Sequence, residues 1–385
     1  MTGKSYLDHN ATSPIRPDVR DAVMAALDVT GNPSSVHGFG RAARRVVEDA
    51  RASVAALVGV IPARVVFTSG GTEANTAALR ATGRRRVLVS AIEHDSVLET
   101  VPDAERVPVT AGGVIDLEAL DRMLASGDGP ALVSVMMVNN ETGVVQPVAD
   151  AAATAHRHGA LLHCDAVQAA GRLDLDTDAL AVDLMTLSAH KLGGPQGVGA
   201  LITREGLAIT PVLRGGGQEQ RRRAGTENVA GLAGFGAAAR LALGNPGERE
   251  RLAGLRDGLE SRALQAAEAI GARATVHGRH AARVANTSCL SLPGASSETQ
   301  LMAFDLAGVA VSAGSACSSG KVKPSHVLTA MGVAADEAGS AIRVSLGWNT
   351  TAEDIDRFLA AWARLCERRA RAPVAAGVAQ PSAYL

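Results

Sequence analysis

A lysine followed by glycines lies in residues 188–199, which read Ser-Ala-His-Lys-Leu-Gly-Gly-Pro-Gln-Gly-Val-Gly. The apolar run of residues 182–188 predicts a strand that ends just before Lys191. A lysine amine in this position can form a Schiff base with an aldehyde cofactor, and pyridoxal phosphate (PLP) is the usual one. Ser188 and His190 add a hydroxyl and an imidazole suited to a phosphate. A solvated lysine on a surface turn is the alternative, and the motif alone favours it.

An aspartate ends a second apolar run in residues 161–168, Leu-Leu-His-Cys-Asp-Ala-Val-Gln. The Asp165 carboxylate can pair with a protonated pyridine nitrogen and so keep a PLP ring able to accept electrons. Gln168 can donate a hydrogen bond to the phenolate oxygen of the ring. The alternative for Asp165 is a helix N-cap, which is common wherever a strand leads into a helix.

A strand, a glycine turn and the start of a helix follow one another in residues 65–75. Gly70 and Gly71 let the backbone approach a ligand closely, and Thr72 begins the predicted helix. The free N–H groups and the dipole of a helix start attract phosphate. The segment is neither a Walker loop nor a dinucleotide fingerprint, because it lacks both the Gly-Lys-Ser/Thr ending and the three-glycine spacing.

Together these segments resemble the fold-type I PLP enzymes, and specifically the cysteine desulfurases of the NifS/IscS type in the class V aminotransferase family. The similarity covers nearly the whole chain, and its motifs occur in the family order. The matching segments are residues 6–12, 31–37, 68–75, 93–94, 139–147, 165–168, 188–191, 215–219, 225–228, 314–320 and 342–347. The resemblance implies an α/β fold, with a mostly parallel seven-stranded sheet in a large PLP-binding domain and a smaller α+β domain.

The resemblance also implies roles for residues that are unremarkable by themselves. His94 would stack on the PLP ring and relay protons, whereas a loop histidine is the alternative. Asn140 would contact the phenolate and the substrate carboxylate, although paired asparagines are ordinary turn residues. Thr226 matches a position that reaches the phosphate of the neighbouring subunit, which implies a homodimer with composite active sites. The arginines at 221–223 just before it would otherwise be a solvated charge run.

Arg343 lies in a short apolar segment, residues 342–346, that predicts a strand. An unpaired guanidinium would be costly in such a place, so a carboxylate partner is expected. The substrate carboxylate is the partner that the resemblance implies. An internal salt bridge is the alternative.

The chain has four cysteines, and one of them differs from the rest. Cys164, Cys289 and Cys366 lie in apolar or helical patterns typical of small core residues. Cys317 lies among serines and glycines with two lysines close behind, a setting that suits an exposed and reactive thiol. An inconsequential loop cysteine is the alternative that the resemblance disfavours. Because no Cys-x-x-Cys spacing occurs, we expect no intrinsic metal site, although Cys317 could be a transient iron–sulfur ligand.

Composition excludes several classes of protein. The chain has 385 residues and a formal net charge of −1, so bulk charge predicts affinity for neither nucleic acid nor a membrane surface. The N-terminus has no basic-then-apolar leader, and no apolar run approaches the roughly 18 residues of a membrane span. With few, unpaired cysteines, a reducing cytoplasm is the expected location.

Strand and helix patterns alternate along the first part of the chain. The helical patterns are residues 40–58, 73–82, 117–125, 148–158 and 229–243. The strand patterns are residues 65–68, 86–90, 132–138, 161–164, 183–188 and 199–202. This alternation predicts a mostly parallel sheet, with ligand groups gathered at the carboxyl ends of its strands.

After residue 247 the pattern changes. A charged helix is predicted at 248–270, followed by short strands at 274–276, 287–292, 309–312 and 342–346 and a helix at 352–371. We therefore predict a large domain at residues 13–247, a small domain made of residues 1–12 and 248–371 that carries the Cys317 segment, and a tail at 372–385.

The resemblance implies a cysteine desulfurase that converts L-cysteine to L-alanine. Cys317 would take the sulfur as a persulfide and pass it to an acceptor. The acceptor would use the sulfur for iron–sulfur cluster assembly or for thiolation. A selenocysteine lyase or another class V aminotransferase is the alternative enzyme. A non-catalytic sulfur-relay protein is disfavoured because Lys191, Asp165 and His94 are all present.

Overall fold

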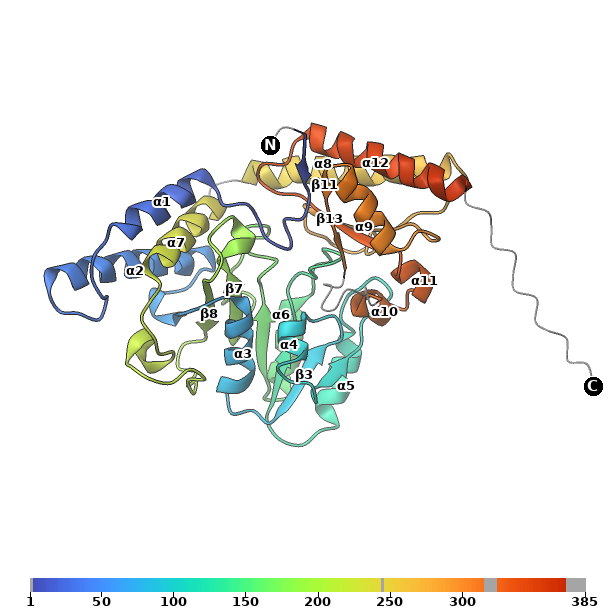
Figure 1. Cartoon of the computed structure of the whole chain (residues 1–385). Coiled ribbons are helices and arrows are strands. Elements are labelled where there is room, and N and C mark those ends of the chain that lie inside the picture. The colour runs from blue at the N-terminus through green and yellow to red at the C-terminus, as the bar shows by residue number, and fades with distance from the viewer. Residues whose placement is uncertain (1–2, 244–245, 315–323, 372–385) are drawn as a thin grey trace, which may run out of the picture.

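A seven-stranded sheet forms the centre of the larger part of the chain (Figure 1). This computed structural model describes residues 3–243, 246–314 and 324–371. In spatial order the strands are β2 (Val65–Thr68), β8 (Gly199–Thr203), β7 (Leu184–Ser188), β6 (Leu161–Asp165), β5 (Ala131–Ser134), β3 (Arg86–Ser90) and β4 (Glu105–Val107). Only β8 runs antiparallel to its neighbours. The predicted α/β fold with a mostly parallel sheet is confirmed.

Helices cover both faces of this sheet, which explains the continuous apolar strands. One face packs against α1 (Pro17–Leu27), α2 (Gly38–Leu57), α5 (Leu117–Ala125), α6 (Val148–Arg157) and α7 (Val229–Leu243). The other face packs against α3 (Gly71–Ala81) and the short α4 (Asp95–Leu98). Successive side chains of β2 point to opposite faces of the sheet, so Phe67 packs in the first cluster and Val66 packs in the second.

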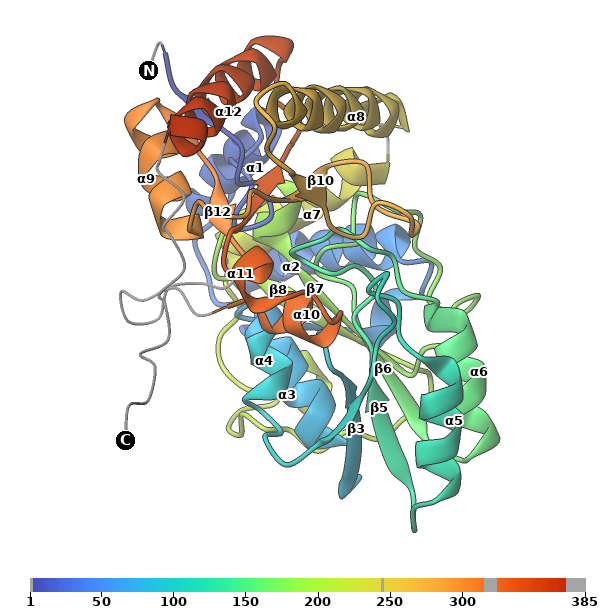
Figure 2. The same cartoon turned by 90° about the vertical axis from the view of Figure 1, so that its right-hand side faces the viewer.

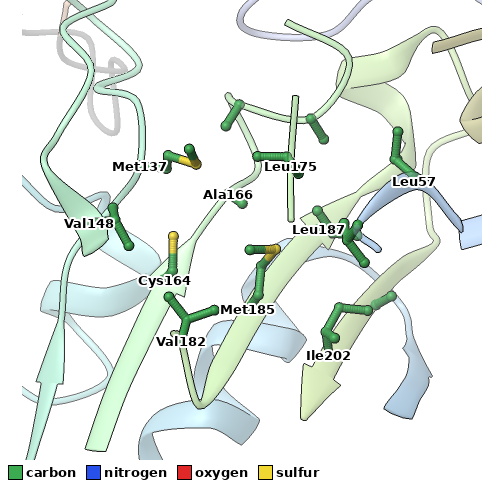
Figure 3. Packing of buried hydrophobic residues seen from close by; sticks show 14 of the residues in the cluster. Leu57, Met137, Val148, Cys164, Ala166, Leu175, Val182, Met185, Leu187 and Ile202 are labelled. Carbon is green, nitrogen blue, oxygen red and sulfur yellow. The ribbon is translucent and has the colours of Figure 1, made fainter. Parts of the chain in front are cut away.

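Figure 3 shows the first of these clusters where β6, β7 and β8 meet the covering segments. Cys164 lies fully buried there beside Met185 and Val182. Cys289 and Cys366 are also buried. All three are core residues, as predicted.

A second core holds together the N-terminal strand and the C-terminal part (Figure 2). Its strands are β1 (Ser5–Tyr6), β9 (Thr275–Val276), β10 (Thr287–Ser291), β11 (Val309–Ala310), β12 (Ser312–Ala313) and β13 (Ala341–Ser345). The short helices α10 (His326–Ala330) and α11 (Ala335–Ala338) pack instead in a separate buried cluster with Ile92 and Met136. The helices of the second core are α8 (Pro246–Glu268), α9 (Ser297–Leu306) and α12 (Ala352–Arg371). Phe304 and Phe358 stack at 4.8 Å in its centre. No helix in the described part is long and apolar enough to cross a membrane.

The N-terminal strand joins this second core directly, because β1 pairs in parallel with β11. The remaining strands form an antiparallel sheet in the order β12–β13–β10–β9. The division of the chain into two domains at the predicted boundaries stays a prediction.

Two predicted strands were wrong in extent. The strand predicted at 132–138 ends at Ser134, where pairing with β3 stops. Val135 N–H and Met137 N–H still donate to carbonyls of β6, so the chain continues along β6 without a regular ladder. The strand predicted at 309–312 is two strands, because Val309–Ala310 pairs with β1 and Ser312–Ala313 pairs with β13.

Candidate active site

A pocket of about 250 Å³ lies at the carboxyl ends of the sheet strands. Most of the residues predicted to bind a cofactor line it together, namely Gly71, Thr72, His94, Asn140, Asp165, Gln168, Ser188, His190 and Lys191. The lining also includes residues that the sequence did not single out, namely Asn75, Ser96, Met136 and Val167. Neither Arg343 nor Thr226 is among the lining residues. Cys317 lies outside the described residues.

Asp165 ends β6 inside the pocket and is held in one orientation. Its Oδ2 accepts a 2.8 Å hydrogen bond from Asn75 Nδ2, and its Oδ1 accepts one of 2.9 Å from the N–H of Val167. The second bond is a local turn contact, and no helix begins after Asp165, so its alternative interpretation as a helix N-cap is wrong. Asn75 ties the carboxylate to Ser96 as well, which it contacts at 2.8 Å. A fixed, buried carboxylate of this kind can hold a proton on a pyridine nitrogen.

Lys191 lies in a 3₁₀ turn (Ala189–Leu192) directly after β7. Its Nζ donates hydrogen bonds of 2.6 and 2.8 Å to the carbonyl oxygens of Asn10 and Ala11. Burial, together with the positive charges of Arg343 and Arg172, lowers the pKa of the Lys191 amine to about 7. A near-neutral amine is what nucleophilic attack on an aldehyde needs.

We expect the reactivity of this amine in the cofactor-free protein to rise with a midpoint near pH 7. Competitive acetylation across pH 5.5–9.5, read by peptide mass spectrometry, measures it. Removing a neighbouring positive charge with Arg343→Gln should favour the protonated amine and shift the midpoint to higher pH. A wild-type midpoint above about pH 9 would contradict the expected effect of burial.

One end of the pocket is built from a helix start. Gly71 and Thr72 begin α3, whose first N–H groups have no partner within the helix. A Cβ placed at Gly71 would lie 3.0 Å from Val167 Cγ2 and 3.5 Å from Ser188 Cβ, so a larger residue would crowd Val167 in the pocket wall. The Ser188 hydroxyl is buried and has no hydrogen-bond partner within the described residues. A phosphate group would satisfy both the helix start and this hydroxyl, so the site fits PLP.

The backbone of residues 10–11 organises the far wall of the pocket. The carbonyl of Asn10 accepts from Lys191 Nζ and also from Gln168 Nε2, the latter at 3.0 Å. The side-chain oxygen of Gln168 accepts from Arg172. Gln168 thus has partners within the protein, and its predicted bond to a PLP phenolate stays a prediction. Neither Asn10 nor Arg172 was singled out from the sequence, because the contact to Lys191 spans 181 positions.

Arg343 has the internal partner that was the alternative interpretation. Its Nη2 donates to Asp8 Oδ1 at 2.8 Å, and its Nη1 donates to the carbonyl of Asn140 at 3.2 Å. Its Nε is buried and has no partner within the described residues. The guanidinium therefore contacts the pocket through the backbone of Asn140 and keeps one donor available. Its role in substrate binding stays a prediction.

Thr226 is exposed and lies in a loop stabilised by ion pairs. The carboxylate of Glu219 is buried against Arg51, with contacts of 2.6 and 2.8 Å. Arg223 pairs with Glu73 at 2.8 Å, so the arginines at 221–223 are more than a solvated charge run. These two ion pairs stabilise a loop in which Glu219 and Gln220 have left-handed φ values of 46° and 56°.

A mostly parallel sheet with a lysine, an aspartate and a phosphate-binding helix start at its carboxyl edge defines a fold-type I PLP enzyme. The model of the aminotransferase class-V family matches residues 5–358. The chain belongs to this family, within its cysteine desulfurase branch, and its cofactor is PLP.

Curated relatives and solved structures agree with this placement. The chain is 44% identical over 369 residues to the cysteine desulfurase of Cereibacter sphaeroides, covering 92% of this chain and 93% of the relative. It is 39% identical over 383 residues to the cysteine desulfurase IscS of Dictyoglomus turgidum, covering 96% of each chain. The structure of a NifS-like protein from Rickettsia africae superposes with a TM-score of 0.88 at 36% identity, covering 94% of this chain and 99% of that one.

Proposed function

We propose that this protein is a cysteine desulfurase that removes sulfur from L-cysteine, leaves L-alanine, and carries the sulfur on Cys317. The observation that carries the proposal is the pairing of a near-neutral Lys191 amine with a buried Asp165 carboxylate in one pocket. The similarity to cysteine desulfurases along more than nine-tenths of the chain supports it.

Each residue of the site has a part in this chemistry. PLP, when bound, supplies an electron sink that makes the Cα proton of the substrate acidic. The neutral Lys191 amine takes that proton, and the Asp165 carboxylate keeps the ring nitrogen protonated. Gly71, Thr72 and Ser188 would hold the phosphate, with His190 beside them, and His94 would contact the ring. Asn140 and Arg343 hold the substrate carboxylate.

Sulfur transfer needs a thiolate from outside the described pocket, and we assign it to Cys317. Its sulfur attacks the sulfur of cysteine, the carbon–sulfur bond of the substrate breaks, and a proton completes the methyl group of alanine. The products are alanine and a Cys317 persulfide, so atoms and electrons balance. Burial raises the pKa of the other thiols, that of Cys366 to about 11, which makes them poor nucleophiles at neutral pH.

The experiment that tests this function incubates the PLP-loaded enzyme with L-cysteine and a thiol reductant, and measures alanine and sulfide. We expect the two products in equal amounts. Activity confined to L-selenocysteine would indicate a selenocysteine lyase. Conversion of pyruvate to alanine at the expense of another amino acid would indicate an aminotransferase. Sulfur transfer without alanine would indicate a relay protein.

We further propose a homodimer in which Thr226 of one subunit reaches the phosphate of the other. Thr226 is exposed and does not line its own pocket, and the exposed apolar residues Val36 and Phe39 offer surface for a partner. The persulfide would pass to an acceptor protein, such as an iron–sulfur scaffold, in a reducing cytoplasm.

Replacing Arg343 with alanine should act mainly on capture of the substrate. Losing a charge-assisted pair to the α-carboxylate costs about 2–4 kcal/mol, which lowers kcat/KM for L-cysteine by roughly 30-fold to 1,000-fold. Cysteamine lacks the carboxylate, so its binding, followed by the absorption of the cofactor, should hardly change. The control Asp8→Asn removes the internal partner but keeps the guanidinium, and should spare the preference for cysteine. Equal losses of binding for cysteine and cysteamine would show that Arg343 pairs only with Asp8 and does not bind the substrate carboxylate.

A further inference from the structure

The carboxyl group of Glu141 lies beside the active-site pocket and has no part in the chemistry described so far. Glu141 directly follows Asn140, which lines the pocket, and is only 1% exposed. Its Oε2 accepts a 2.5 Å hydrogen bond from Ser325 Oγ. Burying a carboxyl group costs free energy unless it is hydrogen-bonded, and the bond from Ser325 offsets part of that cost.

A second segment contacts the same oxygen atom. A Cβ placed at Gly314 would overlap Glu141 Oε2, so only glycine lets the backbone approach the carboxyl group this closely. Gly314 is the last residue described before the Cys317 segment, and Ser325 lies just after it. One carboxyl group therefore contacts the chain on both sides of Cys317.

One further hydrogen bond caps the start of α10, and another fixes it to the wall of the pocket. Ser325 Oγ accepts from the N–H of Leu328 at 3.1 Å, which caps the helix. His326 Nε2 donates to the carbonyl of Glu93 at 2.9 Å, and Glu93 precedes the pocket residue His94. Ser325 and His326 thus connect α10 to two different elements of the pocket.

Glu141 itself lies in a rigid turn. The side-chain oxygen of Asn139 accepts hydrogen bonds of 3.0 Å from the N–H groups of Glu141 and Thr142. The carbonyl of Asn140 accepts from Arg343 at 3.2 Å. The turn that places Asn140 in the pocket therefore also fixes the Glu141 carboxyl group.

We propose that Glu141 is a positioning residue for sulfur transfer, whose carboxyl group holds Gly314 and Ser325 in place relative to the substrate pocket. This inference rests on the proposed desulfurase function with Cys317 as the sulfur carrier. The carboxyl group acts by accepting the hydrogen bond of Ser325 and by packing against Gly314. Burial raises the pKa of Glu141, which favours the neutral acid, and a glutamine can accept the same bond.

The test compares four variants of the PLP-loaded enzyme: Glu141→Ala, Glu141→Gln, Ser325→Ala and Ser325→Thr. Stopped-flow absorption of the cofactor on mixing with L-cysteine reports substrate binding, and quenched-flow alanine reports transfer in a single turnover. We expect Glu141→Ala and Ser325→Ala to slow alanine formation about tenfold or more, with binding within about threefold of wild type. Glu141→Gln and Ser325→Thr keep the hydrogen bond and should stay within about threefold in both measurements.

Hydrogen exchange of the same proteins without substrate provides a readout that does not depend on activity. Glu141→Ala should raise exchange at residues 312–314 and 324–330 together and leave β5 unchanged. Unchanged exchange at either segment, or unchanged alanine formation in both alanine variants, would overturn the proposal. So would a Glu141→Gln variant as slow as Glu141→Ala, which would make the acid a charge or proton donor. A wild-type enzyme that forms no alanine from L-cysteine would overturn the desulfurase function, and exchange would still decide whether Glu141 holds the two segments.

Discussion

The Lys191→Ala variant is expected to lose covalent attachment of PLP and to lose turnover of L-cysteine by a factor on the order of 10³ or more. The reason is that one amine serves two purposes. Its lowered pKa, about 7, makes it both a nucleophile for the aldehyde and a base for the Cα proton. The purified variant should lack the visible absorption band of the attached cofactor.

Because the chain has few lysines, the lysine that carries PLP can be identified directly. The chain has only Lys4, Lys191, Lys321 and Lys323. Borohydride reduction of the wild-type holoenzyme should fix PLP on the peptide that contains Lys191. Lys4 is exposed, and Lys4→Ala should keep both the adduct and the activity. A reduced adduct on any other lysine would show that the cofactor site was assigned wrongly.

The sequence predicted the site as far as local pattern reaches. Lys191, Asp165 and Thr72 each follow an apolar strand, and the carboxyl ends of parallel strands meet at one edge of a sheet. The predicted bounds of α5 and α7 match the structure. The sheet order and the pairing of β1 with β11 depend on contacts between distant segments, which no local pattern contains.

Five helices in the described residues were missed, namely α1, α4, α9, α10 and α11, and sequence signals exist for the two longest, α1 and α9. Helix α1 begins with Pro17 at its first turn and an acidic residue next to it, a common helix start. Helix α9 begins after Ser296, whose side chain accepts from the N–H of Thr299. Helix α9 lacks a one-sided apolar pattern, whereas α1 has one that was overlooked.

The polar partners of the site residues were beyond local inference. Asn75 orients Asp165 from a position 90 residues away, and Asp8 meets Arg343 across 335 positions. A carboxylate partner for Arg343 was predicted from the cost of burying its charge, but cost alone cannot say which carboxylate it is. Spacing likewise gave no reason to connect Glu141 with Ser325.

Replacing Cys317 with serine is expected to separate the two halves of the reaction. The change in cofactor absorption on adding L-cysteine should persist, because it depends on Lys191, Asp165 and Arg343. Alanine and sulfide should fall by a factor on the order of 10³, since a hydroxyl is a far weaker nucleophile than a thiolate toward sulfur. Rapid-mixing absorption and product analysis on one sample measure both halves.

The buried cysteines provide the matched control. Cys366 lies 1% exposed in α12, within the second core, and Cys366→Ala removes a thiol without touching the pocket. That variant should keep the desulfurase activity, with at most a modest loss of stability from the small cavity. Iodoacetamide applied to the native holoenzyme should modify Cys317 first, because burial keeps the other three thiols protonated and covered. The enzyme should lose activity at the same rate as Cys317 is modified. Desulfuration of L-cysteine that survives in Cys317→Ser would move the assignment to a different thiol, or to an enzyme that releases sulfur without a protein persulfide.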